Sequence, residues 1–370
     1  MNFLILSAHD YRSPRKAGVH FVAAELAKLG KTRFFSLHYS RLSALKADPR
    51  ASLAPLSNQK AVTPDGVECY LWRTLVHPFS MRRARVLGAL ESLMFRRYIA
   101  RPSPVLIEWV READVVFFES GMAPVFFDLV REINPRAKTI YIASDDLVSI
   151  KAADFVKRSF ARVAPRFDTI CLKTRGMAAE VHAGPNACVI PHGFDFSVDQ
   201  HADPSPYPAG QHAVSLGSML FDPEFFVIAS REFPEVQFHV IGSGMGRHPG
   251  YGPNVQVYGE MPHRQTLPYI KHASIGIAPY RAAHMPPHLG ETSLKLMQYD
   301  HFKLPAVCPH PIVCGCSTRF GYTPGDVASI TQAIRQALAA PRVSTLKHLQ
   351  WSEVVQRMLA PATYADTRLA

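Results

Sequence analysis

The chain has 370 residues, of which 47% are hydrophobic and 19% are charged; this balance is typical of a folded protein and excludes a fibrous or disordered one. The length is too great for one ordinary core and predicts two domains of roughly 150 to 200 residues each. The formal net charge of +11 predicts an anionic partner, which would be a nucleic acid, a phosphorylated small molecule or an anionic lipid surface.

The opening segment lacks a basic lead and has too short an apolar stretch for a signal peptide. No window reaches the roughly 18 apolar residues that a membrane span needs, so we expect the protein to remain in the compartment where it is made. The six cysteines are scattered, several of them in strand-like apolar runs, and we expect buried, reduced thiols. Cys314 and Cys316 lack the two-residue spacing that is usual for zinc or redox pairs.

In the first half, short apolar runs alternate with segments that carry apolar residues at three- and four-residue spacing. Strands are predicted at 3–8, 33–39, 69–76, 115–119, 139–143, 169–172 and 188–191. Helices are predicted at 19–28, 105–113 and 125–133. Such an alternation indicates βαβ units, and hence a mainly parallel sheet covered by helices.

The pattern breaks over residues 199–212, a polar segment with three prolines, where we place the linker. The series then restarts with predicted strands at 213–216, 237–241, 255–258, 275–279 and 306–308 and helices at 224–231, 266–272, 293–301 and 327–339. We therefore predict two doubly wound domains, 1–200 and 201–350, with 351–370 crossing back to the first. Ligands of such sheets bind outside the carboxyl ends of the strands, which places the expected site in a cleft between the domains.

The most specific stretch is ETSLKLMQYD at 291–300. A helix that begins near Thr292 would direct its free N–H groups and positive dipole end at a pyrophosphate, with Ser293 as a further donor and Lys295 as a counter-charge. Gln298, one turn on, could reach the same ligand. The alternative is an amphipathic helix that buries Leu294 and Met297 and leaves Lys295 in solvent.

Two glycine-bearing turns follow the first two strands of the second domain, GSMLFD at 217–222 and IGSGMG at 241–246. Each could bring the backbone close to a ligand. Neither has the full spacing of a dinucleotide fingerprint, and no acidic residue lies where a ribose contact would be expected, which disfavours an NAD enzyme. Ordinary loop chemistry remains the alternative for both.

Basic residues cluster in two places in the first domain. The loop after the first strand contains Arg12, Arg15 and Lys16, which could hold an anionic acceptor or simply lie in solvent. Residues 82–101 combine an apolar helical stripe with flanking arginines, a pattern typical of a helix at an anionic membrane surface, although a core helix with a basic rim fits equally. The stripe consists of Val86, Leu87, Leu90, Leu93, Met94 and Tyr98. No nucleic-acid-binding signature accompanies the charge.

Longer stretches carry a family resemblance over nearly the whole chain. They are TRFFSL at 32–37, CYLWR at 69–73, FESG at 118–121, ASD at 143–145, GSMLFDPEFF at 217–226, HVIGSGMGRHPGYG at 239–252 and RFGYTPG at 319–325. The two Rossmann-like halves, the polar linker and the helix with Ser293, Lys295 and Gln298 resemble the GT-B glycosyltransferases in general. In the stretches above the sequence resembles, more narrowly, the GumK family of glucuronosyltransferases (glycosyltransferase family 70) of xanthan- and acetan-type exopolysaccharide biosynthesis.

The resemblance implies an inverting, metal-independent transfer of glucuronate from UDP-glucuronate to the mannose of a polyprenyl-diphosphate-linked oligosaccharide. It also implies a peripheral enzyme at the cytoplasmic face of the bacterial inner membrane. By position, the catalytic base falls on Asp145, and Glu180 matches a further acidic residue implicated in activity. The implied UDP contacts are Ser218, Met219, Glu260, Tyr280, Ser293, Lys295 and Gln298.

The chain departs from the family pattern at one place: Asp146 follows Ser144 and Asp145 where the family has glycine. Ser and Asp before a helical stretch are also ordinary N-cap residues, so the pair could cap a helix. An inverting transfer needs one general base, and the end of a strand suits it. We assign the base to Asp145 and leave Asp146 as a cap or as a modulator of its charge.

No Asp-x-Asp follows a predicted strand to hold a metal, so the helix start around Ser293 and Lys295 would stabilise the leaving diphosphate. Selection of a uronate needs a cation near the sugar carboxylate, and Arg247, Arg12, Arg15 and Lys16 are the candidates. The alternatives are a GT-B transferase with another nucleotide sugar or acceptor, and a non-catalytic protein that binds sugar nucleotides.

Overall fold

The computed structural model describes residues 1–13, 16–41, 43, 50–81, 88–181, 184–281, 285–286, 288–344 and 346–369. The chain forms two compact units. Unit 1 comprises Met1–Gly193 and Trp351–Ala370, and unit 2 comprises Phe194–Gln350. Two short strands, β9 (Gly193–Phe194) and β16 (Leu349–Gln350), lie where the chain passes from one unit to the other.

The described part of unit 1 contains an eight-stranded sheet in the order β3-β4-β2-β1-β5-β6-β7-β8, in which the pair β3–β4 is antiparallel and the other neighbours are parallel. The strands are β1 (Asn2–Ser7), β2 (Lys31–Ser40), β3 (Lys60–Val62), β4 (Val67–Thr74), β5 (Val115–Glu119), β6 (Lys138–Ala143), β7 (Thr169–Leu172) and β8 (Ala187–Val189). Every residue of β5 and β7 is buried, as expected for parallel strands covered on both faces.

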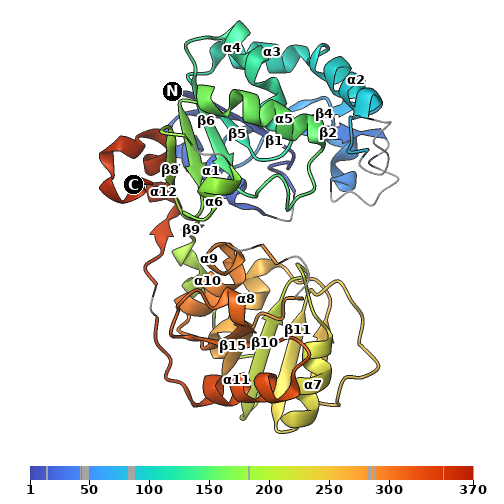
Figure 1. Ribbon diagram of the computed structural model, residues 1–370, viewed down its shortest axis with the longest axis vertical. Helices are drawn as coiled ribbons and strands as arrows, with labels where there is room; N and C mark the ends of the chain where they lie inside the picture. Colours follow the sequence, from blue (N-terminus) through green and yellow to red (C-terminus); the bar gives the residue numbers. More distant parts are fainter. Residues whose placement is uncertain are drawn as a thin grey trace. The chain divides into compact units, whose positions relative to one another are not determined.

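Helices cover both faces of this sheet (Figure 1). They are α1 (Gly18–Leu29), α2 (Gly88–Ile99), α3 (Pro104–Glu112), α4 (Phe127–Ile133), α5 (Asp154–Val163), α6 (Met177–Glu180) and α12 (Trp351–Leu359). In Figure 1, α3, α4 and α5 lie over one face and α1 lies over the other. The C-terminal helix α12 packs on α1, where the rings of Trp351 and Phe21 stack at a centroid distance of 5.1 Å.

Unit 2 has a parallel sheet of its own in the order β12-β11-β10-β13-β14-β15. The strands are β10 (Gln211–Leu216), β11 (Val236–Ile241), β12 (Val255–Tyr258), β13 (Ile275–Ile277), β14 (Ala306–Pro309) and β15 (Arg319–Tyr322). The helices are α7 (Glu224–Glu232), α8 (His263–His272), α9 (Leu289–Thr292), α10 (Leu294–His301) and α11 (Val327–Ala339). Helices α7 and α11 share one hydrophobic cluster with the sheet, while α8 and α10 belong to a second.

The strands and helices predicted from the sequence are present, with bounds that differ by a few residues. Several elements within the described residues were not predicted, namely β3, α5, α6, β9, α9, β15 and β16. The helix predicted over 125–133 begins as a 3₁₀ turn, Ala123–Phe126, and is α-helical from Phe127. The chain passes into unit 2 at Gly193–Phe194, and the polar segment 199–212 belongs to unit 2.

The basic helix predicted over 82–101 is described from Gly88 to Ile99. Residues 82–87, with Arg82, Arg83, Arg85, Val86 and Leu87, lie outside the described part. Contrary to the predicted stripe, Tyr98 is buried in the core against Trp72, and it shares this buried face with Phe95 and Glu91. No helix in the described ranges is long and apolar enough to cross a membrane.

Candidate functional site

The residues predicted to bind the donor gather at the carboxyl edge of the unit 2 sheet. Ser218 and Met219 follow β10, Glu260 follows β12, and Tyr280 follows β13. These strands are parallel, so their carboxyl ends meet at one edge of the sheet, where α/β proteins bind their ligands. The remaining predicted residues, Ser293, Lys295 and Gln298, lie at the start and along helix α10.

The loop after β10 has an unusual backbone. Gly217 adopts a φ of +78° and Leu220 a φ of +50°, and the Gly217 N–H donates to the Ile241 carbonyl at 2.9 Å. Phe221 then forms a β-bridge with Tyr280. This path leaves the Met219 side chain 62% exposed between two anchored points, so the loop presents its backbone and Ser218 at the edge of the sheet.

Ser293 determines where helix α10 begins. It separates α9 from α10 by an extended backbone conformation. It is the N-cap of α10, because its Oγ accepts the Leu296 N–H at 3.3 Å. The Tyr280 hydroxyl lies 2.8 Å from the same Oγ, and both residues are buried. The first N–H groups of a helix have no intrahelical partner, so the start of α10 retains donors and a positive dipole end for an anion.

Lys295 is the second residue of α10. Its Nζ is 5.0 Å from the centroid of the Tyr280 ring, a cation–π arrangement that holds the ammonium group over the phenol. Burial lowers the pKa of Lys295 to about 7. A diphosphate placed beside this lysine would restore the charged form. Lys295 is half-buried and not fully in solvent, while of the two apolar residues in the alternative Met297 is buried and Leu294 is exposed.

Two further predicted donor residues lie on neighbouring elements. The Gln298 amide nitrogen is 2.6 Å from His263 Nε2, which joins α10 to the start of α8. Glu260 is exposed, and its backbone passes Gly242, whose N–H donates to the Tyr258 carbonyl at 3.1 Å. All seven predicted donor residues thus lie along one edge of unit 2.

Unit 1 has its own set of polar residues at the carboxyl edge of its sheet. His9 follows β1, Glu119 ends β5, Asp145 follows β6 and Lys173 follows β7. These four strands are consecutive in the sheet. Asp145 is exposed, and its backbone N–H donates to Ser120 Oγ at 3.1 Å, which fixes the turn that carries it. The predicted base therefore lies at a ligand-binding edge of the fold.

Asp146 has a different role from its neighbour. Its two carboxylate oxygens accept the N–H groups of Val148 and Ser149 at 2.7 Å each, and the residue is only 6% exposed. This is the local capping pattern that a short acidic side chain provides in a turn. Of the two roles left open for Asp146, capping is the one the contacts support.

Glu119 is a member of this edge that sequence reasoning did not single out. It is buried, and its carboxylate accepts the hydroxyl groups of Ser7 and Ser144. Burial raises the pKa of Glu119, and the nearby Asp145 charge raises it further, whereas His9 and Ser7 lower it. A glutamate as the last residue of an apolar strand was the signal that could have found it.

Three of the four cations proposed to select a uronate make hydrogen bonds or an ion pair within their own loops. Arg12 forms a bidentate pair with Asp10, at 2.8 Å from Nε and 2.9 Å from Nη2. Lys16 donates to the Tyr11 carbonyl at 2.7 Å, and Arg247 donates to the carbonyls of Gly252 and Val255. Arg15 and the side chain of Glu180 lie outside the described part of the chain.

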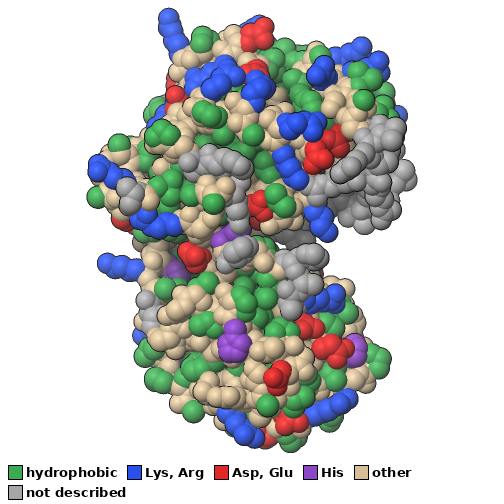
Figure 2. Space-filling view, viewed as in Figure 1, with side chains coloured by type: hydrophobic (Ala, Val, Ile, Leu, Met, Phe, Trp, Pro, Cys, Tyr) green, Lys and Arg blue, Asp and Glu red, His purple; other side chains and the backbone are tan. Residues whose placement is uncertain are grey.

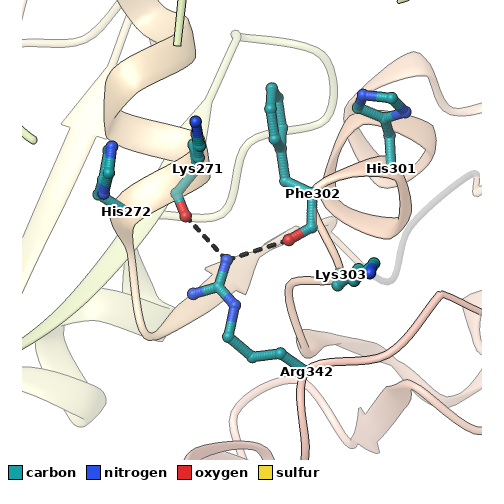
Figure 3. Close-up of a pocket in the computed structure, with 6 residues that line it drawn as sticks. All are labelled: Lys271, His272, His301, Phe302, Lys303 and Arg342. Atoms are coloured by element: carbon teal, nitrogen blue, oxygen red, sulfur yellow. Dashed lines mark hydrogen bonds between the residues drawn. The ribbon is translucent and has the colours of Figure 1, made fainter. Parts of the chain in front are cut away.

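A separate basic pocket of about 480 Å³ opens at the ends of α8 and α10 in unit 2 (Figure 3). Its lining residues are Lys271, His272, His301, Phe302, Lys303 and Arg342. Arg342 donates to the carbonyls of Lys271, Ala273 and Phe302, so it caps the C-termini of both helices. Asp203 pairs with Lys271 and His272. The Asp203 carboxylate thus offsets two of the cationic side chains, and Arg342 links the C-termini of α8 and α10.

Among the described residues, no group of three or more His, Cys, Asp or Glu side chains could hold a metal ion.

Sequence comparison decides the family. The chain is 55% identical over 367 residues to a UDP-glucuronate:glycolipid 2-beta-glucuronosyltransferase of Xanthomonas campestris pv. campestris, covering 99% of this chain and 91% of that protein. The model of the glucuronosyltransferase GumK N-terminal domain matches residues 5–173. The chain belongs to the GumK family of glucuronosyltransferases. Every strand and helix of units 1 and 2 that carries the residues above lies within this similarity.

Solved structures of other glycosyltransferases have a fold similar to that of this chain. A sucrose-phosphate synthase from Thermosynechococcus elongatus superposes with a TM-score of 0.59 at 13% identity, over 98% of this chain and 96% of that one. A UDP-forming trehalose-phosphate synthase from Burkholderia xenovorans gives 0.60 at 12% identity, over 98% and 95%. At this identity the likeness concerns the fold alone. It confirms the predicted GT-B architecture of two Rossmann-like domains.

Proposed function

We propose that this protein is a glucuronosyltransferase that moves glucuronate from UDP-glucuronate to a glycolipid. The observation that carries the proposal is the 55% identity to the Xanthomonas enzyme over 99% of the chain. The finer acceptor is the mannose of a polyprenyl-diphosphate-linked oligosaccharide in xanthan- or acetan-type exopolysaccharide synthesis. Unit 2 binds the nucleotide sugar and unit 1 binds the acceptor.

The donor is held at the edge of unit 2. The N-terminus of α10, the Ser293 hydroxyl and the Lys295 ammonium group contact the diphosphate, and Gln298 contributes from the next turn. Ser218, Met219, Glu260 and Tyr280 complete the contacts from the loops that follow β10, β12 and β13. The Tyr280–Ser293 bond supports this role, since it fixes both side chains before the donor binds.

Asp145 is the general base of an inverting transfer. It removes the proton from the acceptor hydroxyl as that oxygen attacks the anomeric carbon, and the bond to the UDP oxygen breaks on the opposite side. Its exposure and the turn anchored on Ser120 suit this role. Asp146 holds the turn, and Glu180 is a further acidic residue on the acceptor side.

The reaction needs no metal ion. Negative charge grows on the leaving diphosphate in the transition state, and Lys295 together with the dipole of α10 stabilises it. Transfer should therefore persist in excess EDTA. A loss of activity in EDTA that Mg²⁺ restores would contradict metal independence.

A surface of unit 1 binds an anionic membrane, which places the enzyme peripherally at the cytoplasmic face of the inner membrane. We call this surface the α2 patch; it consists of Leu75, Val76, Phe79, Leu90 and Leu93, all exposed, with Arg96, Arg97 and Arg101. Glu91 joins its two segments, because its carboxylate accepts the N–H of Met81 at 2.9 Å from the buried side of α2. Figure 2 shows Lys and Arg side chains gathered over unit 1 among hydrophobic ones.

Arg12, Arg15 and Lys16, in the loop after β1, are the proposed contacts for the anionic group of the acceptor.

The deciding experiment measures transfer of radiolabelled glucuronate from UDP-glucuronate to a bacterial glycolipid extract. We expect a labelled glycolipid with the wild type and none with Asp145→Asn. Transfer from UDP-glucose or another nucleotide sugar in place of UDP-glucuronate would favour a GT-B transferase of other specificity. Binding of UDP-glucuronate without turnover would favour a non-catalytic protein.

A further inference from the structure

Glu119 joins three strand ends of unit 1 through its buried carboxylate. It is 3% exposed and accepts hydroxyl hydrogen bonds from Ser7, the last residue of β1, and from Ser144, just after β6, at 3.3 Å in the latter case. Ser144 is the residue before Asp145. The carboxylate of Glu119 therefore determines where the turn that carries the proposed base begins.

Charged and titratable groups surround this carboxylate from every neighbouring strand. His9 Nε2, after β1, lies 3.9 Å from Glu119 Oε1. Asp145 and Tyr141 interact with it from β6 and the turn after it, and buried Lys173 from the end of β7. Burial raises the pKa of Glu119 and lowers that of Lys173, and their mutual attraction opposes both shifts.

Two carboxylates at the ends of adjacent strands interact unfavourably when both are ionised. A proton taken up by one relieves this repulsion, so each strengthens the other as a base. The interaction between Glu119 and Asp145 is one of those that raise the pKa of Glu119, and electrostatic interaction is reciprocal.

We propose that Glu119 is a positioning residue for Asp145, an inference that rests on the proposed role of Asp145 as the base. It holds the Ser144–Asp145 turn through the two serine hydroxyls, and its negative charge strengthens the hold of Asp145 on the proton of the acceptor. It does not touch the substrate itself.

The first test is Glu119→Gln, which keeps the size and one acceptor oxygen but removes the charge. We expect kcat to fall by about 10- to 100-fold and the acid limb of the kcat–pH profile to move to lower pH by about 0.5 to 1 unit. The KM for UDP-glucuronate stays unchanged, because the donor residues lie in unit 2. An acid limb at the wild-type position, or an unchanged kcat, would overturn the proposal.

Three further variants separate charge from position. Glu119→Asp keeps the charge on a shorter side chain, so kcat falls while the acid limb stays. Ser144→Ala removes one hydrogen bond and lowers kcat without moving the limb. Glu132→Gln, an exposed carboxylate on α4, is the matched control and leaves both unchanged. Binding of UDP, measured by calorimetry, reports whether each variant is folded. If the wild-type protein itself showed no transfer of glucuronate, the proposed function would be overturned and not the role of Glu119.

Arg281 carries a second, independent inference, at the edge of unit 2. It follows Tyr280; its backbone N–H donates to the Leu220 carbonyl at 2.8 Å and its Nε donates to the Phe221 carbonyl at 2.9 Å. The guanidinium is therefore held against the loop that presents Ser218 and Met219. The bond to Phe221 uses only the Nε–H of the guanidinium, which leaves the end formed by the two terminal nitrogens for a further acceptor.

Arg12 forms an ion pair with Asp10, and Arg281 has no comparable ion pair among the described residues. No acidic side chain in the described ranges lies within ion-pair distance of it, and the residue is exposed. Asp222 is near enough for Arg281 to lower its pKa, but burial outweighs this and raises that pKa overall. A cation is thus available beside the proposed donor contacts.

We infer that Arg281 binds the carboxylate of the donor sugar, which rests on the proposed donor site. The two terminal nitrogens of a guanidinium match the two oxygens of a carboxylate, and this bidentate pairing distinguishes a uronate from a neutral hexose.

The test compares inhibition constants of UDP-glucuronate, UDP-glucose and UDP for the wild type and Arg281→Ala. We expect the affinity for UDP-glucuronate to fall about 10- to 100-fold while those for UDP-glucose and UDP stay within about twofold. Arg281→Lys keeps part of the preference, and Arg264→Ala, an exposed arginine on α8, is the matched control. Equal losses for all three ligands, or no loss, would overturn the inference; absence of UDP binding in the wild type would sink the donor site itself.

Discussion

Asp145 and Asp146 are neighbours in the sequence but lie in opposite environments. The Asp146 carboxylate is buried and accepts two backbone N–H groups at 2.7 Å, whereas the Asp145 side chain is exposed at the carboxyl edge of the sheet. The Asp146 carboxylate organises the turn, and the Asp145 side chain lies at its surface. The departure from the family's glycine at position 146 is therefore accommodated by a cap.

This difference predicts separate outcomes for the two aspartates. Asp145→Asn should reduce kcat by about 10²- to 10⁴-fold, because the amide cannot accept the proton, with unchanged thermal stability and UDP affinity. Asp146→Ala should lower the free energy of unfolding by about 1 to 2 kcal/mol through loss of the cap and retain measurable transfer. Both are measured by single-turnover transfer and thermal unfolding. Loss of transfer in Asp146→Asn alone would reverse the assignment.

The pKa of Lys295 predicts how donor affinity depends on pH. Burial lowers this pKa to about 7, and a bound diphosphate raises it again. Below pH 7 the lysine is already charged and affinity is flat; above pH 7 binding must take up a proton, so Kd rises by up to about tenfold per pH unit until the pKa of the complex is reached.

Calorimetry with UDP-glucuronate between pH 6 and 9 measures this dependence. Lys295→Arg is the control, because a guanidinium stays charged throughout and should flatten the profile. A slope in Lys295→Arg equal to that of the wild type would assign the pH dependence to another group.

The bond between Tyr280 and Ser293 predicts a coupled pair. Tyr280→Phe keeps the ring beneath Lys295 but removes the hydroxyl that lies 2.8 Å from Ser293 Oγ, and should cost about 1 kcal/mol of stability. Ser293→Ala removes this bond and the cap of α10 together, and should cost about 1 to 2 kcal/mol and weaken UDP binding. The double variant should cost less than the sum of the two, since both remove the same bond. Strict additivity would mean that the two side chains act independently.

The α2 patch predicts selective binding to anionic vesicles. Replacing Arg96 and Arg97 by serine should remove about 1 kcal/mol of binding for each charge, or roughly 30-fold together, and make the residual binding less sensitive to salt. Leu90→Ser with Leu93→Ser should weaken binding at any salt concentration. Sedimentation with phosphatidylglycerol vesicles measures both. The matched control replaces Arg111 and Arg136, exposed elsewhere on unit 1; an equal loss there would indicate that net charge acts and not the patch.

Several elements show why parts of the fold could be predicted. Strands such as β5 are buried on both faces, so they appear in the sequence as uninterrupted apolar runs. Helix α5 was missed although Val156, Phe160 and Val163 give it a clear buried stripe, because charged residues fill the positions between them. Strand β15 is four residues long and contains Arg319 and Gly321, and its pairing with β14 makes it a strand.

The candidate site, like the fold, has residues whose positions could be predicted from the sequence and residues whose environment could not. Parallel topology places whatever follows a strand at the same edge, so the positions of Ser218, Tyr280 and Asp145 followed from the pattern of strands. The burial of Glu119 did not follow, because it depends on Ser7, which is 112 residues away in the chain. The environment of a buried carboxylate is determined by its partners on other strands, and these pairings are not encoded in local spacing.

Local periodicity and the residue types at strand ends were enough to predict two α/β domains, a helix start near Ser293 and an acidic turn at Asp145, because these properties depend on neighbours a few residues apart. Tertiary contacts decided the rest. Arg247 and Arg342 donate hydrogen bonds to backbone carbonyls, and Tyr98 is buried against Trp72. Asp146 caps its turn, whereas its neighbour Asp145 is exposed. Whether a charge is available to a ligand depends on which distant groups already neutralise it, and only the folded chain brings those groups together.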